Sequence, residues 1–377
     1  MHVAAGLVVA MTVAACTGDR ASVPAFAADL PGQTVCVLYR KDGGPPDAER
    51  VRFLRETMSS LRFAEIAVPS SNGSGIAFLA DAKIEVGWSS LATSTPFRDA
   101  LALVEPNADE VLFVDLQLAL DAALARGASD TGDRGGGAAM AEGYLRDLLR
   151  VVGVRELRAL VLGIATTPNG TRARGALLGS GNGFGPLDLI RGPASPLPLP
   201  SDEPHASAQF AFRVQGDVAA RWLVAASELG DATSLMAQLA GEGQRLLVRT
   251  IGAMLPDLSG WVSLRHLGDQ EYGATLVPND AAAARDVLER KWPPMLRDAL
   301  RDRFGMRIVD DRVWLHVPPR GPFPRTTTFV PSSAPPLEGG LLYGRIRFPA
   351  GSAGLGTSEL RVREHSADRL TIELDLP

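Results

Sequence analysis

Apolar and polar residues alternate along the chain in a pattern that predicts short strands joined by turns and helices. Apolar runs typical of strands cover residues 35–39, 111–114 and 210–214, each close to turn-forming Pro, Gly, Asn or Asp. The clearest hairpin covers residues 160–178, where Thr167-Pro168-Asn169-Gly170 separates two β-patterned runs. Asn-Gly favours a type I′ turn, which needs positive φ twice. A second hairpin is expected over residues 261–277, with its turn at Gly268 and Asp269.

Two longer stretches, residues 48–63 and 281–304, have helical patterns that begin after a possible capping residue. Asp47 and Asp280 stand directly before them, where a carboxylate can accept hydrogen bonds from the N–H groups of the first turn. The second stretch contains Pro293-Pro294, which predicts a break because proline lacks an N–H group and clashes with the preceding turn. Each helix is followed by a predicted strand pair, 76–80 with 83–88 and 306–309 with 312–317.

The chain repeats part of its own pattern after 98 residues. Pro106 and Pro204 each open a polar turn that leads into a strand and then a helical stretch, and they lie 98 positions apart. Gly175 and Gly273 have the same separation, within Gly-Ala-Leu-Leu and Gly-Ala-Thr-Leu. Repeats of about 100 residues are too long for solenoid units and indicate duplicated domains. Because hairpins dominate, we expect an α+β fold of two related units of antiparallel sheet with helices packed on one face.

These patterns divide the chain into seven segments. A flexible loop is expected at residues 127–138, within the first unit, and the last segment is expected to add strands to an existing sheet. The Pro-rich segments are expected to be stiff, and the first of them to separate the two units. The segments are a signal peptide (1–15), a lipidated tether (16–32), a first α+β unit (33–190), a Pro-rich linker (191–204), a second α+β unit (205–318), a Pro-rich segment (319–340) and C-terminal strands (341–377).

The first 15 residues, MHVAAGLVVAMTVAA, contain no acidic or amide side chain. They are too few to span about 30 Å of hydrocarbon, which takes roughly 20 residues, and are typical of a signal peptide. They lead into Val13-Ala14-Ala15-Cys16, which resembles the lipobox of bacterial lipoproteins. The resemblance implies that the Cys16 thiol carries a diacylglycerol anchor, that a dedicated peptidase cleaves between Ala15 and Cys16, and that the protein is held at a membrane in the cell envelope. The duplicated body also resembles uncharacterised envelope lipoproteins of bacteria.

Composition fits a folded body and gives no indication of nucleic acid binding. The chain is 46% hydrophobic and 21% charged, and its net charge of −5 provides no basic surface for nucleic acid. It contains 3 Lys and 35 Arg, but recognition of anions by Arg would require clustering, which is not visible along the sequence. If Cys16 is lipidated, Cys36 has no disulfide partner within the chain. Cys36 lies in an apolar run and is expected to be a small buried hydrophobic residue.

One glycine-rich stretch, Gly179-Ser180-Gly181-Asn182-Gly183-Phe184-Gly185, follows a predicted strand. A nucleophile elbow requires Gly-x-Ser-x-Gly before a helix, but here Ser180 is not central and Pro186 follows. A phosphate loop requires a lysine and a dinucleotide fingerprint requires a following helix, and neither is predicted here. We therefore expect a mobile loop at the end of a hairpin.

The remaining polar residues show no spacing typical of a catalytic or metal site. The histidines His2, His205, His266, His316 and His365 include no H-x-H or H-x-x-x-H pair. The acidic pairs Asp109-Glu110, Asp202-Glu203 and Asp310-Asp311 lie in turns or at the starts of elements, where such residues form caps and turns. With 6% aromatic residues, the chain also lacks the platforms expected of a glycosidase. The sequence therefore predicts no catalytic residue, no cofactor and no metal.

Three functions remain open at this point. The first is a non-catalytic envelope protein that binds a protein or another envelope component, and it requires an exposed apolar patch or an open sheet edge. The second is a lipid-binding or transport lipoprotein, which requires an apolar cavity of several hundred Å³. The third is a hydrolase with a dispersed active site, which requires a nucleophile and a base within hydrogen-bond reach in a cleft. In each case the expected partners are the membrane, through lipid on Cys16, and an unknown envelope component.

Overall fold

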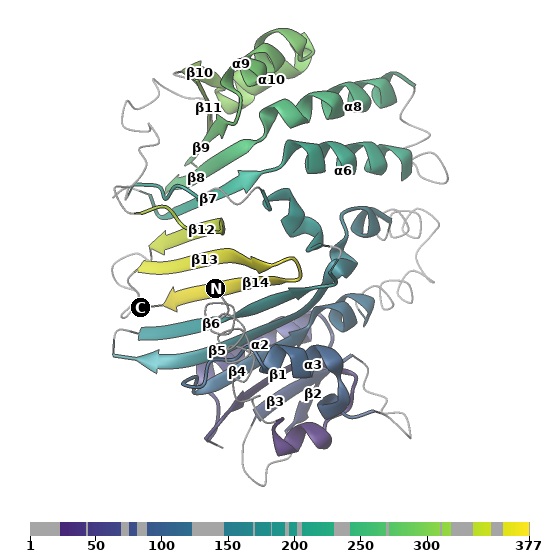
Figure 1. The fold of residues 1–377 in the computed structure, drawn as a ribbon, viewed down its shortest axis with the longest axis vertical. Helices are drawn as coiled ribbons and strands as arrows, with labels where there is room; N and C mark the ends of the chain where they lie inside the picture. The colour runs from purple at the N-terminus through teal and green to yellow at the C-terminus, as the bar shows by residue number, and fades with distance from the viewer. Residues whose placement is uncertain are drawn as a thin grey trace, which may run out of the picture.

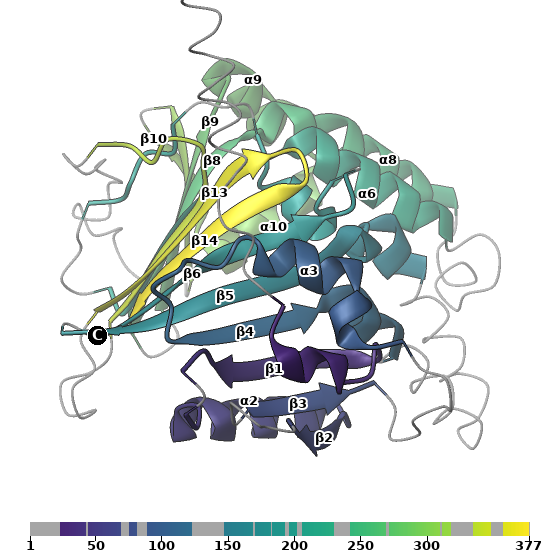
Figure 2. The same ribbon diagram turned by 60° about the horizontal axis from the view of Figure 1, so that its bottom comes forward.

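A computed structural model describes residues 23–42, 44–68, 75–80, 89–122, 147–168, 170–181, 183–192, 196–201, 206–229, 242–268, 271–309, 311–317, 335–347 and 357–376. The strands in this part form one 14-stranded sheet, in the order β10-β11-β9-β8-β7-β12-β13-β14-β6-β5-β4-β1-β3-β2. All of its neighbouring strands are antiparallel. The sheet twists steadily, so β1 and β4 run across the direction of β8 and β9 (Figures 1 and 2).

The strands are β1 (Thr34–Arg40), β2 (Ala64–Ala67), β3 (Gly75–Leu79), β4 (Glu110–Asp115), β5 (Leu157–Thr167), β6 (Gly170–Gly179), β7 (Ala208–Val214), β8 (Gly260–Gly268), β9 (Glu271–Pro278), β10 (Arg307–Val309), β11 (Arg312–Val317), β12 (Gly340–Arg347), β13 (Thr357–Ser366) and β14 (Arg369–Leu376). The α-helices are α2 (Ala48–Ser60), α3 (Thr95–Leu101), α6 (Gly216–Leu229), α8 (Glu242–Met254), α9 (Ala281–Asp286) and α10 (Pro294–Phe304). The shorter turns are η1 (Ala25–Ala28), η2 (Leu91–Thr93), η3 (Val154–Glu156), η4 (Gly185–Leu189), η5 (Leu255–Leu258) and the π-helical η6 (Val287–Lys291). Among the described helices, none is both long and apolar enough to cross a membrane.

The three C-terminal strands lie in the middle of the sheet. β12 pairs with β7, β14 pairs with β6, and β13 lies between β12 and β14. The yellow strands of Figure 1 accordingly lie between the teal strands β6 and β7. Within the sheet, β1–β6 and β7–β11 are therefore joined through β12–β14.

The two ends of the sheet have the same connections between elements. At one end, β1 leads through α2 into a hairpin whose second strand, β3, lies between β1 and β2. At the other end, β9 leads through α9 and α10 into a hairpin whose second strand, β11, lies between β9 and β10. The expected mixed α+β class is confirmed. The predicted strand at residues 83–88 lies outside the described residues, and the described neighbours of β3 are β1 and β2.

Helices cover both faces of the sheet, so the expectation of helices on one face is wrong. Val37 and Phe113 pack with Phe97 of α3 on one face, which we call the α3 face. Leu38 and Phe78 pack with Leu54 and Met58 of α2 on the opposite face, the α2 face. The cause is visible in β1, where residues 35–39 are all buried. A strand that is apolar on both sides must be covered on both sides.

Local signals in the sequence place several of the element boundaries. Asp47 caps α2 by accepting hydrogen bonds from the N–H groups of Glu49 and Arg50, as predicted. Asp280 caps α9 through Ala283 N, which is also as predicted. The predicted break at Pro293-Pro294 is confirmed, since η6 ends before it and α10 begins at Pro294.

The first hairpin is present, but its turn is displaced by one residue from the prediction. Thr167 pairs with Gly170, so the two residues between the strands are Pro168 and Asn169. Gly170 has φ +129° and belongs to β6. Proline favours the first central position of common turns because its φ is fixed near −65°, a value incompatible with type I′. The observed register accordingly differs by one residue from that of a turn centred on Asn169 and Gly170.

Two segments that we expected to be loop or linker are packed against the sheet. Phe184, in the glycine-rich stretch after β6, is fully buried, and its N–H donates to Asp188 at 3.2 Å. Leu197, in the expected Pro-rich linker, is also fully buried. The predicted flexible loop at residues 127–138 lies outside the described residues.

Candidate functional site

The residues singled out in the sequence lie far apart or outside the described part of the chain. Ala15 and Cys16, the expected cleavage and lipidation site, are not among the described residues, and neither are His2 and His205. Cys36 is fully buried in β1, and burial raises the pKa of its thiol to about 12. The thiolate is therefore scarce near neutral pH, in agreement with the expected structural role.

A row of polar side chains crosses the α3 face of the sheet. Cross-strand pairing places them side by side on eight neighbouring strands, with Gly273 of β9 as the one residue in the row without a side chain. In sheet order the row is His316, Gly273, Arg265, Gln209, Arg345, Glu359, Asp375 and Arg172. Sequence analysis missed it because each strand contributes a single residue and the strand order is not encoded locally.

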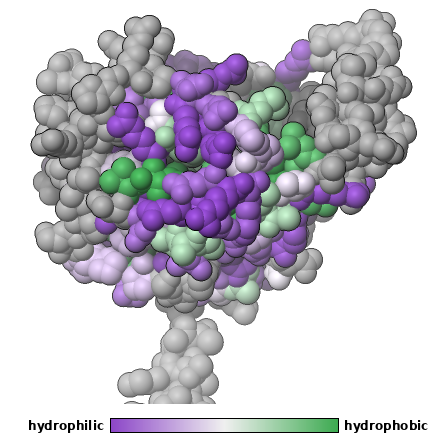
Figure 3. Space-filling model, turned by 90° about the horizontal axis from the view of Figure 1, so that it is seen from above, coloured by the Kyte–Doolittle hydropathy of each residue, from purple (hydrophilic) through white to green (hydrophobic). Residues whose placement is uncertain are grey.

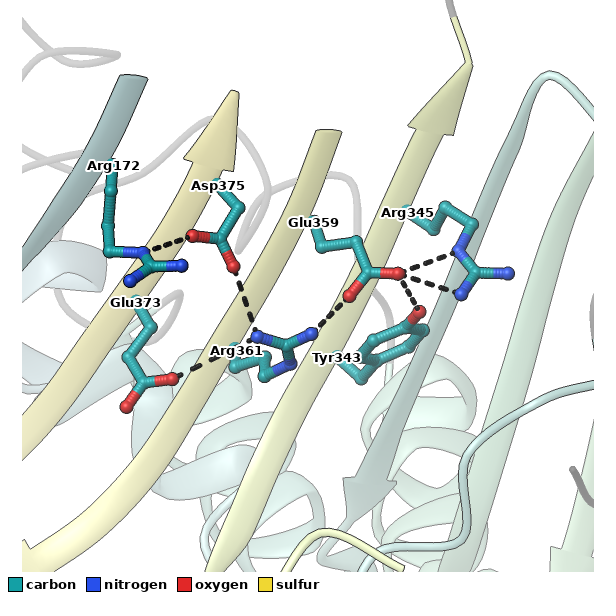
Figure 4. A network of polar contacts seen from close by, with 7 residues as sticks. All are labelled: Arg172, Tyr343, Arg345, Glu359, Arg361, Glu373 and Asp375. Atoms are coloured by element: carbon teal, nitrogen blue, oxygen red, sulfur yellow. Dashed lines mark hydrogen bonds and ion pairs between the residues drawn. The ribbon is translucent and has the colours of Figure 1, made fainter. Parts of the chain in front are cut away.

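The half of this row on β12, β13, β14 and β6 belongs to a connected ionic network (Figure 4). Arg172 Nε lies 2.9 Å from Asp375 Oδ1, and Arg361 Nη1 lies 3.2 Å from Asp375 Oδ2. Arg361 also contacts Glu359, whose Oε1 accepts hydrogen bonds from Arg345 at 2.7 and 3.1 Å. The arginine clustering that the sequence did not reveal is therefore present in space.

The network is balanced in charge. Arg172, Arg345 and Arg361 face Glu359, Glu373 and Asp375, three positive charges against three negative. Tyr343 donates to Glu359 Oε1 at 3.2 Å, and burial, followed by the nearby Glu359 charge, raises the pKa of Tyr343. Since every charge in the network has a partner, its arrangement favours fixing the strands over binding a free ion.

The other half of the row borders a shallow depression above Gly273. The depression, about 240 Å³ including its open mouth, is lined by Arg265, Thr275, Trp314 and His316 among others. Gly273 forms its floor, because a Cβ built there meets only Leu267, at 3.8 Å. His316 Nε2 lies 2.8 Å from Glu271 Oε1.

A serine and a histidine are in hydrogen-bond contact at the start of β7. Ser207 Oγ lies 2.5 Å from His266 Nδ1, and the His266 ring packs on Tyr272 with centroids 4.8 Å apart. Within the described ranges, no carboxylate is found in contact with His266. The same residues contain no group of three or more His, Cys, Asp or Glu that could hold a metal ion.

Exposed apolar side chains lie on the α2 face, on strands β9, β8 and β12. Tyr272 lies beside His266, which lies beside Ala208, and Ala208 lies beside Ile346 on β12. Tyr272 is 52% exposed and Ile346 40%, while Leu264, one position along on the same face, is 37% exposed. We call Leu264, Tyr272 and Ile346 the exposed apolar row.

The end of the molecule formed by α9 and α10 has a more polar surface than the exposed apolar row. Viewed from above in the orientation of Figure 1, this surface is mainly hydrophilic, with small, separate apolar areas (Figure 3). Charged side chains of α10 that are exposed here include Asp298, Arg301, Asp302 and Arg303. Met295 of α10 is 72% exposed and Val309 of β10 48%, so charged side chains predominate at this end with single apolar residues among them.

Comparison with known proteins gives no further guide. No family model matches the chain, and neither a curated protein nor a solved structure is significantly similar to it.

Proposed function

We propose that this protein is a lipid-anchored, non-catalytic component of the cell envelope that binds a protein partner. The observation that supports this best is the exposed apolar row, because large apolar side chains gathered on one surface are typical of interaction sites. The lipobox supports the anchor at Cys16 and hence the location.

The surroundings of the exposed apolar row favour a protein partner. Tyr272, an aromatic residue with a polar tip, stands at one end of it, and Tyr is enriched in protein interfaces. The ring of His266 lies beside that of Tyr272, and its Nδ1 lies 2.5 Å from Ser207 Oγ, so fixed polar groups lie beside the apolar side chains. An apolar centre with a polar rim is the usual composition of a protein interface.

We also propose that the sheet arose by internal duplication. The observation that supports this is the repeated order of elements at the 98-residue offset: β4, a helical stretch and the hairpin β5–β6 are matched by β7, the helices α6 and α8, and the hairpin β8–β9. In this proposal the two related units correspond to residues 33–190 and 205–318, and β12–β14 were added between them.

The anchor is tested by metabolic labelling with radioactive palmitate. The wild-type protein is expected to incorporate the label and Cys16→Ala to lose it, while Cys36→Ala, at the buried cysteine, should label like the wild type. Equal labelling of wild type and Cys16→Ala would refute the anchor.

The interface is tested by site-specific photocrosslinking in cells. A photoreactive residue at Ile346 or Leu264 is expected to give a discrete adduct, whereas the same residue at Arg301, on the solvated end of the molecule, should give none. The Ile346 adduct should disappear when Tyr272→Asp introduces a charge into the row. Identical adduct patterns at positions 346 and 301 would contradict the proposal.

A second candidate function, hydrolysis, is favoured by one observation, the contact between Ser207 and His266. In this reading Ser207 is the nucleophile and His266 the base. The test is turnover of a panel of p-nitrophenyl esters by the wild type and by Ser207→Ala. An activity that Ser207→Ala abolishes would favour this function over the first, and equal background rates would exclude it.

A further inference from the structure

A Pro-rich segment lies across the α3 face of the sheet in a manner typical of a bound peptide. Residues 196–201 read Pro-Leu-Pro-Leu-Pro-Ser and are not part of any strand. Leu197 and Leu199 pack in one cluster with Trp261 of β8, Ala211 of β7 and Tyr343 of β12. We call residues 196–201 the strap.

Side chains of the sheet donate hydrogen bonds to the backbone carbonyls of the strap. Gln209 Nε2 donates to Ser201 O at 3.2 Å, and an Arg213 guanidinium nitrogen donates to Pro196 O at 3.1 Å. These two donors stand four residues apart on the same face of β7 and reach the two ends of the strap. Pro-rich segments have solvated carbonyls and no internal hydrogen bonds, so aromatic side chains with well-placed donors are the usual means of recognising them.

A second segment completes the contact. The backbone of Leu197 forms two hydrogen bonds with that of Leu337, at 2.9 and 3.0 Å, and Leu337 is 6% exposed. Leu337 passes so close to the start of β12 that a Cβ on Gly340 would lie 2.7 Å from its side chain. Leu337, packed against the start of β12, therefore forms one wall of the site in which the strap lies.

The strap leaves two buried polar atoms of the site without a hydrogen-bond partner. Gln209 Oε1 and Ser263 Oγ are both unpartnered, and each residue is 1% exposed. Within the strap, the three prolines have no N–H group and the N–H of Leu197 donates to Leu337 O, which leaves the N–H groups of Leu199 and Ser201. An unsatisfied buried acceptor destabilises the state that contains it. An extended segment with N–H groups in place of these prolines offers more donors to Gln209 Oε1 and Ser263 Oγ than the strap does.

We propose that this surface is a binding site for an extended Leu- and Pro-rich segment of another protein, and that the strap occupies it in the absence of that partner. Trp261, Ala211 and Tyr343 would receive the apolar side chains, while Gln209 and Arg213 would bind the carbonyls. This inference goes beyond the proposed function, because it concerns the opposite face from the exposed apolar row and does not depend on the anchor.

The experiment releases the strap from the α3 face by substitution and adds a peptide with the sequence of the strap. Leu197→Asp places a charge at a fully buried position and should release the strap. The probe is a fluorescein-labelled peptide, ASPLPLPSD, which copies residues 194–202, and binding is read from fluorescence anisotropy. The matched control peptide, ASPSPSPSD, replaces both leucines with serine.

Saturable binding of ASPLPLPSD to Leu197→Asp, at least tenfold tighter than that of the control peptide, is the expected result. The wild type should bind it at least tenfold more weakly than the variant does. Adding Gln209→Leu to Leu197→Asp should weaken binding about fivefold, as expected for loss of one hydrogen bond of about 1 kcal/mol.

Leu199→Ser, at a half-buried position, is a milder second variant in case Leu197→Asp does not fold. Circular dichroism identifies which variants are folded. A folded variant that binds neither peptide, or binds both equally, would overturn the proposal, and the palmitate and crosslinking results would stand unchanged.

Discussion

The charged residues that contact this sheet differ widely in burial and in the number of hydrogen bonds they form. Glu110 is the most enclosed of the carboxylates in described ion pairs, with 3% of its side chain exposed. Its Oε2 lies 2.6 Å from Arg50 Nη1, and its Oε1 accepts a hydrogen bond from Asp47 N at 2.8 Å. Arg50 also donates to Thr171 Oγ1 at 3.3 Å. One ion pair thus links α2 to both β4 and β6.

Breaking the ion pair between Arg50 and Glu110 is expected to destabilise the folded protein. Arg50→Met leaves Glu110 buried without its cation, so we expect a loss of about 3 kcal/mol in the free energy of unfolding. The measurement is urea denaturation followed by circular dichroism.

Arg52 of the same helix provides the matched control. It lies 3.9 Å from Glu49, and both side chains are mostly exposed. Arg52→Met should therefore change stability by less than about 0.5 kcal/mol. Equal losses for Arg50→Met and Arg52→Met would show that the buried pair has no special role.

Asp115 should make stability depend on pH in the opposite sense from the surface carboxylates. Burial raises the pKa of Asp115, although Leu118 N donates to its Oδ1 at 2.8 Å. A raised pKa in the folded state favours folding below the ordinary pKa of an aspartate, and this contribution is lost as pH rises through the folded value. Asp115→Asn can still cap the helical residues that follow. It should raise the urea midpoint at pH 7, with a gain that shrinks towards pH 4.

Single residues could be predicted from the sequence where the signal lies in their immediate neighbours. The buried state of Cys36 and the caps at Asp47 and Asp280 follow from their immediate neighbours. The ionic network was missed because the pattern Glu359-Leu360-Arg361 is typical of a strand with one solvated face. Only the strand order reveals that the charges of β13 face those of β12 and β14.

At the scale of the element, the two glycines that the repeat aligns have different structural roles. A Cβ on Gly175 of β6 would lie 1.8 Å from Val161 O on β5, so the two backbones approach too closely for any side chain. A Cβ on Gly273 of β9 would meet only Leu267, at 3.8 Å. The glycine is therefore structurally required in the first hairpin and not in the second.

This difference gives a matched pair of substitutions. Gly175→Ala should lower the free energy of unfolding by at least about 2 kcal/mol, because β5 and β6 must separate. Gly273→Ala should be neutral or slightly stabilising, since alanine restricts the unfolded chain. Thermal unfolding of both variants is the measurement. A larger loss for Gly273→Ala than for Gly175→Ala would contradict this account of the two hairpins.

Helices and strands could be predicted where a turn residue, a cap or a proline marks them in the sequence. Both hairpins and the broken helix follow from turn residues and proline. β2 was missed because its four residues, Ala64–Ala67, are too few to show a period, and the predicted helix ran on to residue 63. The strap was missed for a different reason, because a Pro-rich segment is typical of a linker unless a surface exists to receive it.

At the scale of the molecule, the sheet depends on strands from the end of the chain. β14 makes eight registered cross-strand pairs with β6, from Arg369 with Leu178 to Leu376 with Thr171. On the other side, β12 pairs with β7 from Ile346 to Leu342. Such an arrangement cannot be derived from the sequence, because nothing near residue 340 indicates which two strands will receive it.

Truncation after Gly339 should therefore destabilise the whole sheet. Removing residues 340–377 exposes an edge on β6 and another on β7, and unpaired edges promote aggregation. We expect soluble yield and resistance to limited proteolysis to fall sharply. Arg52→Met, an exposed change on α2, is the control and should leave protease resistance unchanged. A truncated protein as resistant as the full chain would contradict the central role of β12–β14.

The central position of β12–β14 also has a consequence for biogenesis. A polypeptide leaves the ribosome or a translocation channel from its N-terminus, so β6 and β7 emerge long before their shared neighbours do. During that interval each has an unpaired side, and the sheet cannot close until the final segment arrives. The native sheet can therefore close only after residues 340–376 have been synthesised and have paired with β6 and β7.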